Sequence, residues 1–239
     1  MNELDKLKSM IADSKIIVFF GGAGVSTESG LPDFRSQDGI YSLKYKYPPE
    51  VMLSHRFFMN NTEDFYEFYR NKMIYPDVKP NKAHLALAML EKQGKLKAVV
   101  TQNIDGLHQL AGSVNVLELH GSVLRNFCMS CRKFFEIGKI TGSSDVPKCD
   151  CGGLIKPDVV LYGEGLDTDT LEKSVEHISD ADMLIVGGTS LNVYPAAGLV
   201  NYYRGNKLVL INMEATPYDS HADLIIRGKI GEVLGSVIG

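Results

Sequence analysis

The stretch from Phe19 to Arg35 constrains the fold of this chain more than any other. Five apolar residues, Ile16–Phe20, run directly into the glycine-rich segment Gly21–Gly24. Glycines after a strand allow a tight turn and let a phosphate group approach the backbone closely. We expect a helix to begin near Val25, with its first N–H groups facing that phosphate. Strand, glycine turn and helix together predict a dinucleotide-binding site.

The glycine spacing departs from the usual dinucleotide fingerprint. It is Gly22-x-Gly24-x-x-Thr27, so a threonine stands where the third glycine is expected. No clear acidic residue ends a second strand about 20 residues further on, where a dehydrogenase holds the cofactor ribose. The sequence therefore indicates chemistry other than ordinary hydride transfer.

Length and charge exclude several classes of protein. At 239 residues the chain can form one large domain, or one domain with a small insert. A net charge of -4 argues against direct nucleic-acid binding. No apolar run approaches the roughly 20 residues that span a bilayer, and residues 1–14 lack the layout of a signal peptide. We therefore expect a cytoplasmic protein with no membrane partner.

The order of the apolar segments predicts an α/β fold. Strands are expected at residues 16–20, 97–101, 115–119, 159–161, 183–186, 208–211 and 224–226. Helices are expected at residues 3–13, 81–93, 168–178 and 195–204, with one or two more within 50–75 and a long loop, interpreted as a lid, at 36–50. Because apolar strands alternate with helices, we expect a mostly parallel, doubly wound sheet. The aromatic residues within 50–75 fit either a helix core or a hydrophobic wall for an acyl or cofactor group.

Four cysteines lie in one polar, poorly periodic stretch that indicates an inserted module. Their spacing is Cys128-x-x-Cys131, then 17 residues, then Cys149-x-Cys151. Two close pairs of thiolates are typical of a structural zinc site, in which protein fills all four tetrahedral positions. The second pair is one residue shorter than the commoner spacing. Free structural thiols are the alternative, whereas disulfides are not expected in the cytosol.

Polar residues follow several of the predicted strands where each strand ends. They are TQNID (Thr101–Asp105), His120 with Gly121, and GGTS (Gly187–Ser190). Taken singly, Asn103 and Asp105 fit turn residues, and a lone histidine more often packs or caps. Open α/β sheets bind ligands at the carboxyl ends of their strands, so these groups together favour one shared cleft beside the glycine turn.

Motifs over nearly the whole chain resemble those of the sirtuins of bacterial type, which are NAD-dependent protein lysine deacylases. In the family's order they are GAGVSTESGLPDFR (Gly22–Arg35), TQNID, His120-Gly121, the four cysteines, KPDVVLYGE (Lys156–Glu164), GTSLNVYPAA (Gly188–Ala197) and Ile211-Asn212. The resemblance implies a Rossmann-like NAD-binding domain made of residues 1–35, 77–121 and 156–239. It implies a smaller domain made of a helical insert, residues 36–76, and a zinc-binding module, residues 122–155.

The resemblance also implies roles residue by residue. The catalytic residues are His120 and Asn103, and Cys128, Cys131, Cys149 and Cys151 hold a structural Zn²⁺. The NAD-binding residues are Gly22, Ala23, Gly24, Thr27, Asp33, Phe34, Arg35, Gln102, Asn103, Ile104, Asp105, His120, Gly188, Thr189, Ser190, Asn212 and Ile230. The acyl-lysine protein substrate adds as a strand alongside Val159, Tyr162, Gly163 and Glu164.

In the implied reaction the acyl oxygen of the substrate displaces nicotinamide from NAD, and the products are free lysine and O-acyl-ADP-ribose. His120 acts as the general base on a ribose hydroxyl. Asp105 accepts from the nicotinamide carboxamide, and Phe34 shields the ribose carbon from water. Zinc takes no part in the chemistry. NAD is consumed, so the ribose-binding acidic residue of a dehydrogenase is not needed.

The helical insert departs from the pattern of the desuccinylating members of the family, and this difference predicts the acyl preference. Desuccinylating members carry a Tyr-x-x-Arg pair, but here Tyr66 is followed by Tyr69, with Arg70 one place late. One residue turns a helical side chain by about 100°, so we expect acetyl and other uncharged acyl groups. Protein ADP-ribosyl transfer at the same NAD site is the alternative activity. A zinc-stapled NAD sensor without catalysis and a plain NAD dehydrogenase are further alternatives.

Overall fold

The six-stranded sheet of the larger part is entirely parallel. The computed structural model describes residues 2–34, 39–42, 45–142 and 144–238. In spatial order the strands are β3 (Val116–Glu118), β2 (Leu96–Thr101), β1 (Ile17–Gly21), β7 (Met183–Gly187), β8 (Leu208–Ile211) and β9 (Leu224–Ile226). The path of the chain through this sheet starts at β1, runs outward through β2 to β3, and returns to β7 on the other side of β1. This order defines a Rossmann-like sheet, whose ligand crevice lies where β1 and β7 end.

Helices cover both faces of this sheet, and every residue of β1 and β7 is therefore buried. One face packs on α1 (Glu3–Ala12), α5 (Lys82–Lys92) and α9 (Ile230–Ile238), with Phe19 and Ile185 at its centre. The other face packs on α8 (Thr168–Asp180) and the 3-10 segment Ala196–Tyr202, with Phe20 and Val186 at its centre. The alternation of Phe19 and Phe20 between the two cores follows from the two-residue period of a strand.

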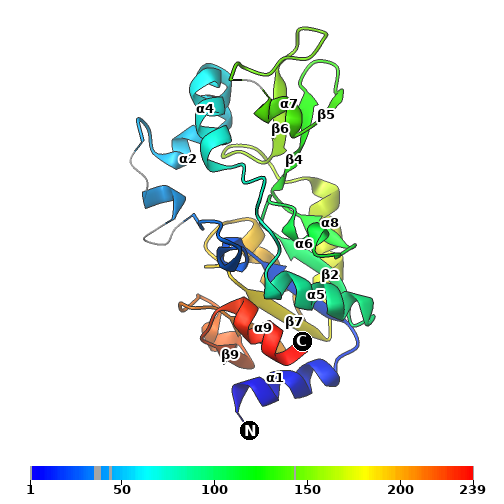
Figure 1. Ribbon diagram of the computed structural model, residues 1–239. Helices are drawn as coiled ribbons and strands as arrows, with labels where there is room; N and C mark the ends of the chain where they lie inside the picture. The colour runs from blue at the N-terminus through cyan, green and yellow to red at the C-terminus, as the bar shows by residue number, and fades with distance from the viewer. Residues whose placement is uncertain (1, 35–38, 43–44, 143, 239) are drawn as a thin grey trace.

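A smaller part lies at the other end of the molecule (Figure 1). Its antiparallel sheet has the order β5-β4-β6, with β4 (Gly121–Cys128) between β5 (Phe134–Glu136) and β6 (Ile155–Val159). Its helices are α2 (Pro49–Met52), α3 (His55–Asn60), α4 (Thr62–Lys72) and α7 (Gly138–Thr141). One apolar core joins these helices to the small sheet through Phe58, Tyr66, Ile140 and Ile155. The predicted domain limits themselves stay a prediction.

Most predicted elements are present, and four differ. Residues 159–161 were expected as a strand of the parallel sheet, but the strand ends at Val159 and pairs antiparallel with β4. Three helices, α2, α3 and α4, occupy residues 49–72 in place of one or two. The predicted helix at 195–204 is a 3-10 segment. No α-helix begins at Val25: two 3-10 turns, Ala23–Val25 and Thr27–Ser29, follow β1.

The remaining short helix, α6 (Leu107–Leu110), follows β2 and lies beside α5. The predicted lid at 36–50 falls partly outside the described residues, and Ile40–Ser42 within it form a 3-10 turn. None of the helices in the described part of the chain is both long and apolar enough to cross a membrane.

Candidate functional site

Two glycine turns meet at the point where β1 and β7 end. Gly24 N–H donates to the carbonyl of Gly188 at 2.8 Å. A Cβ on Gly24 would lie 2.8 Å from Gly188 Cα, and a Cβ on Gly22 would lie 2.9 Å from Thr189 Cβ. Gly188 also has a φ of +59°, and its Cβ would meet Val25 N at 2.4 Å. The turns therefore interlock only because these residues have no side chain.

A chain of side-chain hydrogen bonds crosses the sheet below these turns. Gln102 Nε2 donates to Thr189 Oγ1 at 3.0 Å. Thr189 and Asn212 are joined twice: Thr189 N–H donates to Asn212 Oδ1 at 3.1 Å, and Asn212 Nδ2 donates to the Thr189 carbonyl at 2.8 Å. The ends of β2, β7 and β8 are thus held in one fixed arrangement at the crevice.

Ser26 links the glycine turn to the segment after β2. Its hydroxyl donates to Asp105 Oδ2 at 2.7 Å and accepts from Asn103 Nδ2 at 3.0 Å. Asn103 is only 8% exposed, and the other oxygen of Asp105 accepts from Leu107 N–H at 2.9 Å. Ser26 was not among the predicted site residues, because only its contacts to residues far along the chain reveal it.

His120 lies just after β3, at the junction between the two sheets. Its Nδ1 lies 3.0 Å from the backbone carbonyl of Gln102. A carbonyl can only accept, so Nδ1 carries the proton, and Nε2 of the neutral ring is left with a lone pair. Burial lowers the pKa of His120, and the hydrogen bond to Gln102 offsets this only in part. The imidazole is therefore neutral near pH 7 and oriented as a base.

The loop after β6 forms the side of the cleft that belongs to the smaller part. Tyr162 N–H donates to the carbonyl of Leu53 at 3.0 Å, and His55 N–H donates to the carbonyl of Tyr162 at 2.9 Å. Both backbone groups of Tyr162 are thus already paired with the segment between α2 and α3. Its side-chain hydroxyl is hydrogen-bonded to that of Tyr41, whose ring packs edge-on against Phe34.

Glu164 ties this loop to its surroundings. Its carboxylate accepts from Leu161 N–H at 2.9 Å and pairs with Lys156 Nζ at 3.0 Å and His55 Nδ1 at 2.8 Å. Burial alone raises the pKa of Glu164, but these hydrogen bonds outweigh it and hold the pKa below its usual value. The Glu164 side chain thus holds the loop after β6 in place.

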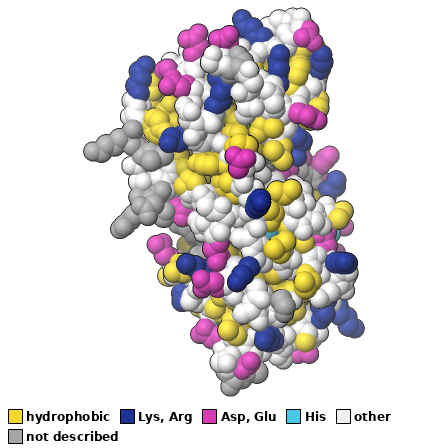
Figure 2. All heavy atoms as spheres, viewed as in Figure 1, with side chains coloured by type: hydrophobic (Ala, Val, Ile, Leu, Met, Phe, Trp, Pro, Cys, Tyr) yellow, Lys and Arg dark blue, Asp and Glu magenta, His cyan; other side chains and the backbone are white. Residues whose placement is uncertain are grey.

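These groups line one cleft of about 1010 Å³ between the two parts. Figure 2 shows hydrophobic side chains gathered across this middle zone of the molecule. All the described residues that were predicted to bind NAD or peptide line the cleft; they are Gly22, Ala23, Gly24, Thr27, Asp33, Phe34, Gln102, Asn103, Ile104, Asp105, His120, Gly188, Thr189, Ser190, Asn212, Ile230, Val159, Tyr162, Gly163 and Glu164. Arg35 lies outside the described residues. The individual roles stay predictions.

The four cysteines form a separate cluster at the end of β4. Their sulfur atoms all lie within 4.8 Å of one another, with three of the separations at 3.5, 3.5 and 3.6 Å. Zinc–sulfur bonds of about 2.3 Å in a tetrahedron place sulfurs about 3.8 Å apart, so the cluster fits Zn²⁺. A Cβ on Gly153 would lie 2.7 Å from Cys128 Sγ. The short Cys149-x-Cys151 spacing is therefore compatible with four ligands.

Tyr66, Tyr69 and Arg70 do not line the cleft. Both tyrosine rings are fully buried in the core of the smaller part. Arg70 Nε donates to the carbonyl of Ile140 at 2.7 Å, and its other nitrogens bind the carbonyls of Ser144 and Asp145. Arg70 therefore fastens α4 to the cysteine-bearing module. This supports the helix-core interpretation of the aromatic stripe for these two rings.

Fold and site define an α/β protein with a dinucleotide crevice, a neutral buried histidine beside it and a thiol cluster suited to zinc. Residues 22–195 match the model of the Sir2 family. The chain is 63% identical to an NAD-dependent protein deacetylase of Clostridium acetobutylicum, over 100% of this chain and 99% of that one. It is 60% identical to the protein of the same description in Clostridium tetani, over 100% and 98%.

Solved structures agree. A mutant Sir2 homologue in complex with ADP ribose superposes with a TM-score of 0.91 at 42% identity, covering 100% of this chain and 95% of that one. A structure described as Sir2, p53 peptide and NAD+ superposes with a TM-score of 0.86 at 40% identity, covering 99% and 97%. The chain belongs to the Sir2 family.

Proposed function

We propose that this protein is an NAD-dependent protein deacetylase that transfers the acetyl group of a modified lysine to ADP-ribose, releasing nicotinamide and O-acetyl-ADP-ribose. Close relatives described as NAD-dependent protein deacetylases support the activity. A structural neighbour described with a p53 peptide and NAD+ supports both substrates. One structural neighbour holds a deacetylated p53 peptide and 3'-O-acetyl ADP ribose, which supports the product.

The tautomer of His120 is the observation that carries the mechanism. With Nδ1–H bound to the Gln102 carbonyl, Nε2 is the free base of a ring that burial keeps neutral. A neutral imidazole with a free lone pair can accept the proton of a ribose hydroxyl. NAD supplies the electrophilic ribose carbon and the leaving group; His120 supplies the proton acceptor.

The residues at the crevice fit a dinucleotide. Gly22, Gly24 and Gly188 let the two turns pack against each other, and all three line the cleft, so we assign the pyrophosphate to the backbone of these turns. We assign the adenosine half to Thr189, Asn212 and neighbouring residues at the β7 and β8 ends. The nicotinamide half is assigned to Asn103, Ile104 and Asp105, beside His120.

The substrate is proposed to be an acyl-lysine protein with an uncharged acyl group. Arg70 is occupied by backbone carbonyls of the smaller part and is absent from the cleft. Lys72 reaches the cleft, but its Nζ lies 5.9 Å from the centre of the Tyr45 ring, which is not among the cleft-lining residues. Lys229 also lines the cleft, but it lies beside Ile230 at the start of α9 and pairs with Glu232 at 3.7 Å. We therefore expect no dedicated partner for an acyl carboxylate among the described residues.

The parts that enclose this site are proposed as two domains, with limits as predicted from the sequence: 36–76 with 122–155, and the remainder of the chain. Separate apolar cores support this division, because Phe58 and Ile140 share one core while Phe19 and Ile185 share another. Strand β6 (Ile155–Val159) forms the edge between them, since it pairs with β4 yet leads directly into the cleft loop.

The experiment is an acyl-peptide assay with NAD, followed by mass spectrometry. We expect free lysine peptide, nicotinamide and O-acetyl-ADP-ribose in equal amounts, and slower turnover of a succinyl-lysine peptide. His120→Asn places an amide N–H where Nδ1 donates to the Gln102 carbonyl but removes the base at Nε2, so kcat should fall by about 10² or more, while ADP-ribose binding by calorimetry should change far less than kcat. Protein-bound ADP-ribose without free peptide would instead establish ADP-ribosyl transfer. A full rate in the variant would refute the role of His120.

A further inference from the structure

The strand pair that joins the two parts contains a large bulge. β4 and β6 pair at Gly121 with Val159 and at Ser122 with Asp158, but the next pair is Asn126 with Pro157. β4 therefore advances four residues, from 122 to 126, while β6 advances one, from 158 to 157. Three residues of β4 are extra, and they are 123–125. Bulges bend a strand and redirect its side chains, and they are common beside active sites.

The bulge is anchored to the larger part through its backbone. Val123 N–H donates to the carbonyl of Ile104 at 2.9 Å, so the first extra residue is tied to the segment after β2. Leu124 N–H donates to Ser122 Oγ at 3.2 Å. These bonds fix the start of β4. Arg125, the last of the three extra residues, pairs with Glu136 of β5, and its side chain reaches the junction between the sheets.

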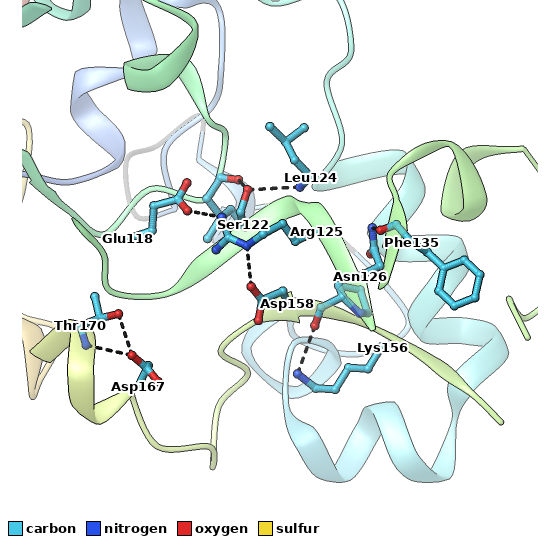
Figure 3. Close-up of polar contacts among 12 residues, drawn as sticks. Glu118, Ser122, Leu124, Arg125, Asn126, Phe135, Lys156, Asp158, Asp167 and Thr170 are labelled. Carbon is cyan, nitrogen blue, oxygen red and sulfur yellow. Dashed lines mark hydrogen bonds and ion pairs between the residues drawn. The ribbon is translucent and has the colours of Figure 1, made fainter. Parts of the chain in front are cut away.

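Arg125 spans the junction between the two sheets with two ion pairs. Its Nη1 lies 2.6 Å from Glu118 Oε2, at the end of β3 in the parallel sheet. Its Nε lies 2.8 Å from Asp158 Oδ2, on β6 in the small sheet. Figure 3 shows the guanidinium between the two carboxylates. The Glu118 side chain is only 8% exposed, against 40% for Arg125 and 39% for Asp158.

In the sequence, the two carboxylates lie close to His120 and to the loop that is proposed to hold the peptide. Glu118 precedes His120 by two residues, and Asp158 precedes Val159, where the cleft loop begins. The chain segments are also joined directly, because Val160 N–H donates to the His120 carbonyl at 3.0 Å. The loop and the base are thus linked at one point, and a change in the angle between the sheets would strain this link and shift the rest of the peptide loop relative to His120.

We propose that the Glu118–Arg125–Asp158 triad is an ionic strut that sets the orientation of the small sheet against the parallel sheet, and that Arg125 is a positioning residue for the peptide substrate. The geometry suits a strut: a planar guanidinium holds two carboxylates in fixed directions, which a lysine point charge does not. Arg125 touches no reacting group. The kinetic part of this inference rests on the proposed deacetylase function.

The test compares Arg125→Met, Arg125→Lys and Asp158→Asn with the wild type and with Lys46→Met, which removes a different ion pair, to Asp64, away from the junction. Arg125→Met should raise KM for an acetyl-lysine peptide about tenfold, with the Kd for ADP-ribose within about twofold, since the dinucleotide crevice lies on the parallel sheet. Arg125→Lys should recover part of the peptide KM. Lys46→Met should behave as wild type.

Asp158→Asn guards against simple unfolding, because Glu118 keeps its partner in that variant. We expect a smaller rise in peptide KM at an unchanged melting temperature. Peptide KM values at the wild-type level in both Arg125→Met and Asp158→Asn would overturn the strut, as would equal losses of peptide and ADP-ribose affinity. Amide hydrogen exchange at residues 121–126 gives a readout independent of activity: it should quicken in Arg125→Met. An inactive wild type would refute the proposed function, whereas unchanged exchange would refute the strut.

Discussion

Acidification should destabilise this protein through two buried histidines that take no part in the proposed chemistry. His84 on α5 and His108 on α6 are 0% and 1% exposed, and their rings lie 4.7 Å apart. Asn81 N–H donates to His84 Nδ1 at 3.2 Å, so the proton of the neutral ring is on Nε2. Neither nitrogen of His108 has a hydrogen-bond partner among the described residues. Protonation would place two like charges in an apolar core.

Burial lowers the pKa of His84 to about 4, although Asp105 opposes the shift. Burial and the nearby His84 lower the pKa of His108 to about 3. In the unfolded chain a histidine has a pKa of about 6.5. The unfolded state therefore binds more protons at acidic pH. The contribution of the two neutral histidines to the free energy of unfolding is fully present above about pH 7, and it is lost as the pH falls toward 4 for His84 and 3 for His108. Between pH 7.5 and 5.5 each histidine should contribute a loss of about 1.4 kcal/mol.

Urea unfolding at pH 7.5, 6.5 and 5.5, followed by circular dichroism, measures this loss. The perturbation is His108→Leu, which replaces the buried imidazole with an apolar side chain of similar size. Because all other groups titrate in both proteins, the difference in pH dependence isolates His108, and it should be about 1.4 kcal/mol smaller for the variant. His221→Leu, at an exposed position, controls for the loss of any one histidine. An equal pH dependence in wild type and His108→Leu would refute the reasoning.

Two further predictions concern the parts around the cleft. Chelation of zinc should loosen the end of β4 and abolish turnover of acetyl-peptide, while ADP-ribose binding persists. Loss of ADP-ribose binding would show that the module also supports the crevice. In urea unfolding, Gly121→Ala should destabilise the protein by at least about 2 kcal/mol more than Gly94→Ala. Both glycines have φ near +75°, but a Cβ at Gly121 would lie 1.9 Å from Asp158 O, whereas the space at Gly94 is open. Equal losses would contradict the steric argument.

The parallel sheet was predictable because its strands are short apolar runs buried on both faces. All five residues of β1 and all five of β7 are buried, which is the pattern expected when helices cover both sides. The shared cleft was predictable for a related reason. Parallel strands end at one edge, so Gln102, His120 and Thr189 come together although they are far apart in the sequence.

The rest depends on contacts that a sequence pattern does not carry. Residues 159–161 are as apolar as a parallel strand, but pairing with β4 rather than hydrophobicity decides where β6 ends and which way it runs. Ser26 and Arg125 have no local signature: Ser26 acts through Asn103 and Asp105, and Arg125 through a bulge that only the pairing of β4 with β6 creates. Periodicity specifies which face is buried, and it does not specify the partner.

The missing third glycine also has a structural explanation. In the usual fingerprint that glycine lets a helix pack closely against the first strand. Here no helix follows β1: the chain leaves in two 3-10 turns that end at Gly30, whose φ is +89°. Thr27 therefore meets no packing limit, and its hydroxyl donates to the carbonyl of Gly24 at 2.9 Å. The close backbone contact lies instead between Gly24 and Gly188. Glycine is therefore required in the turn after β7 rather than at position 27.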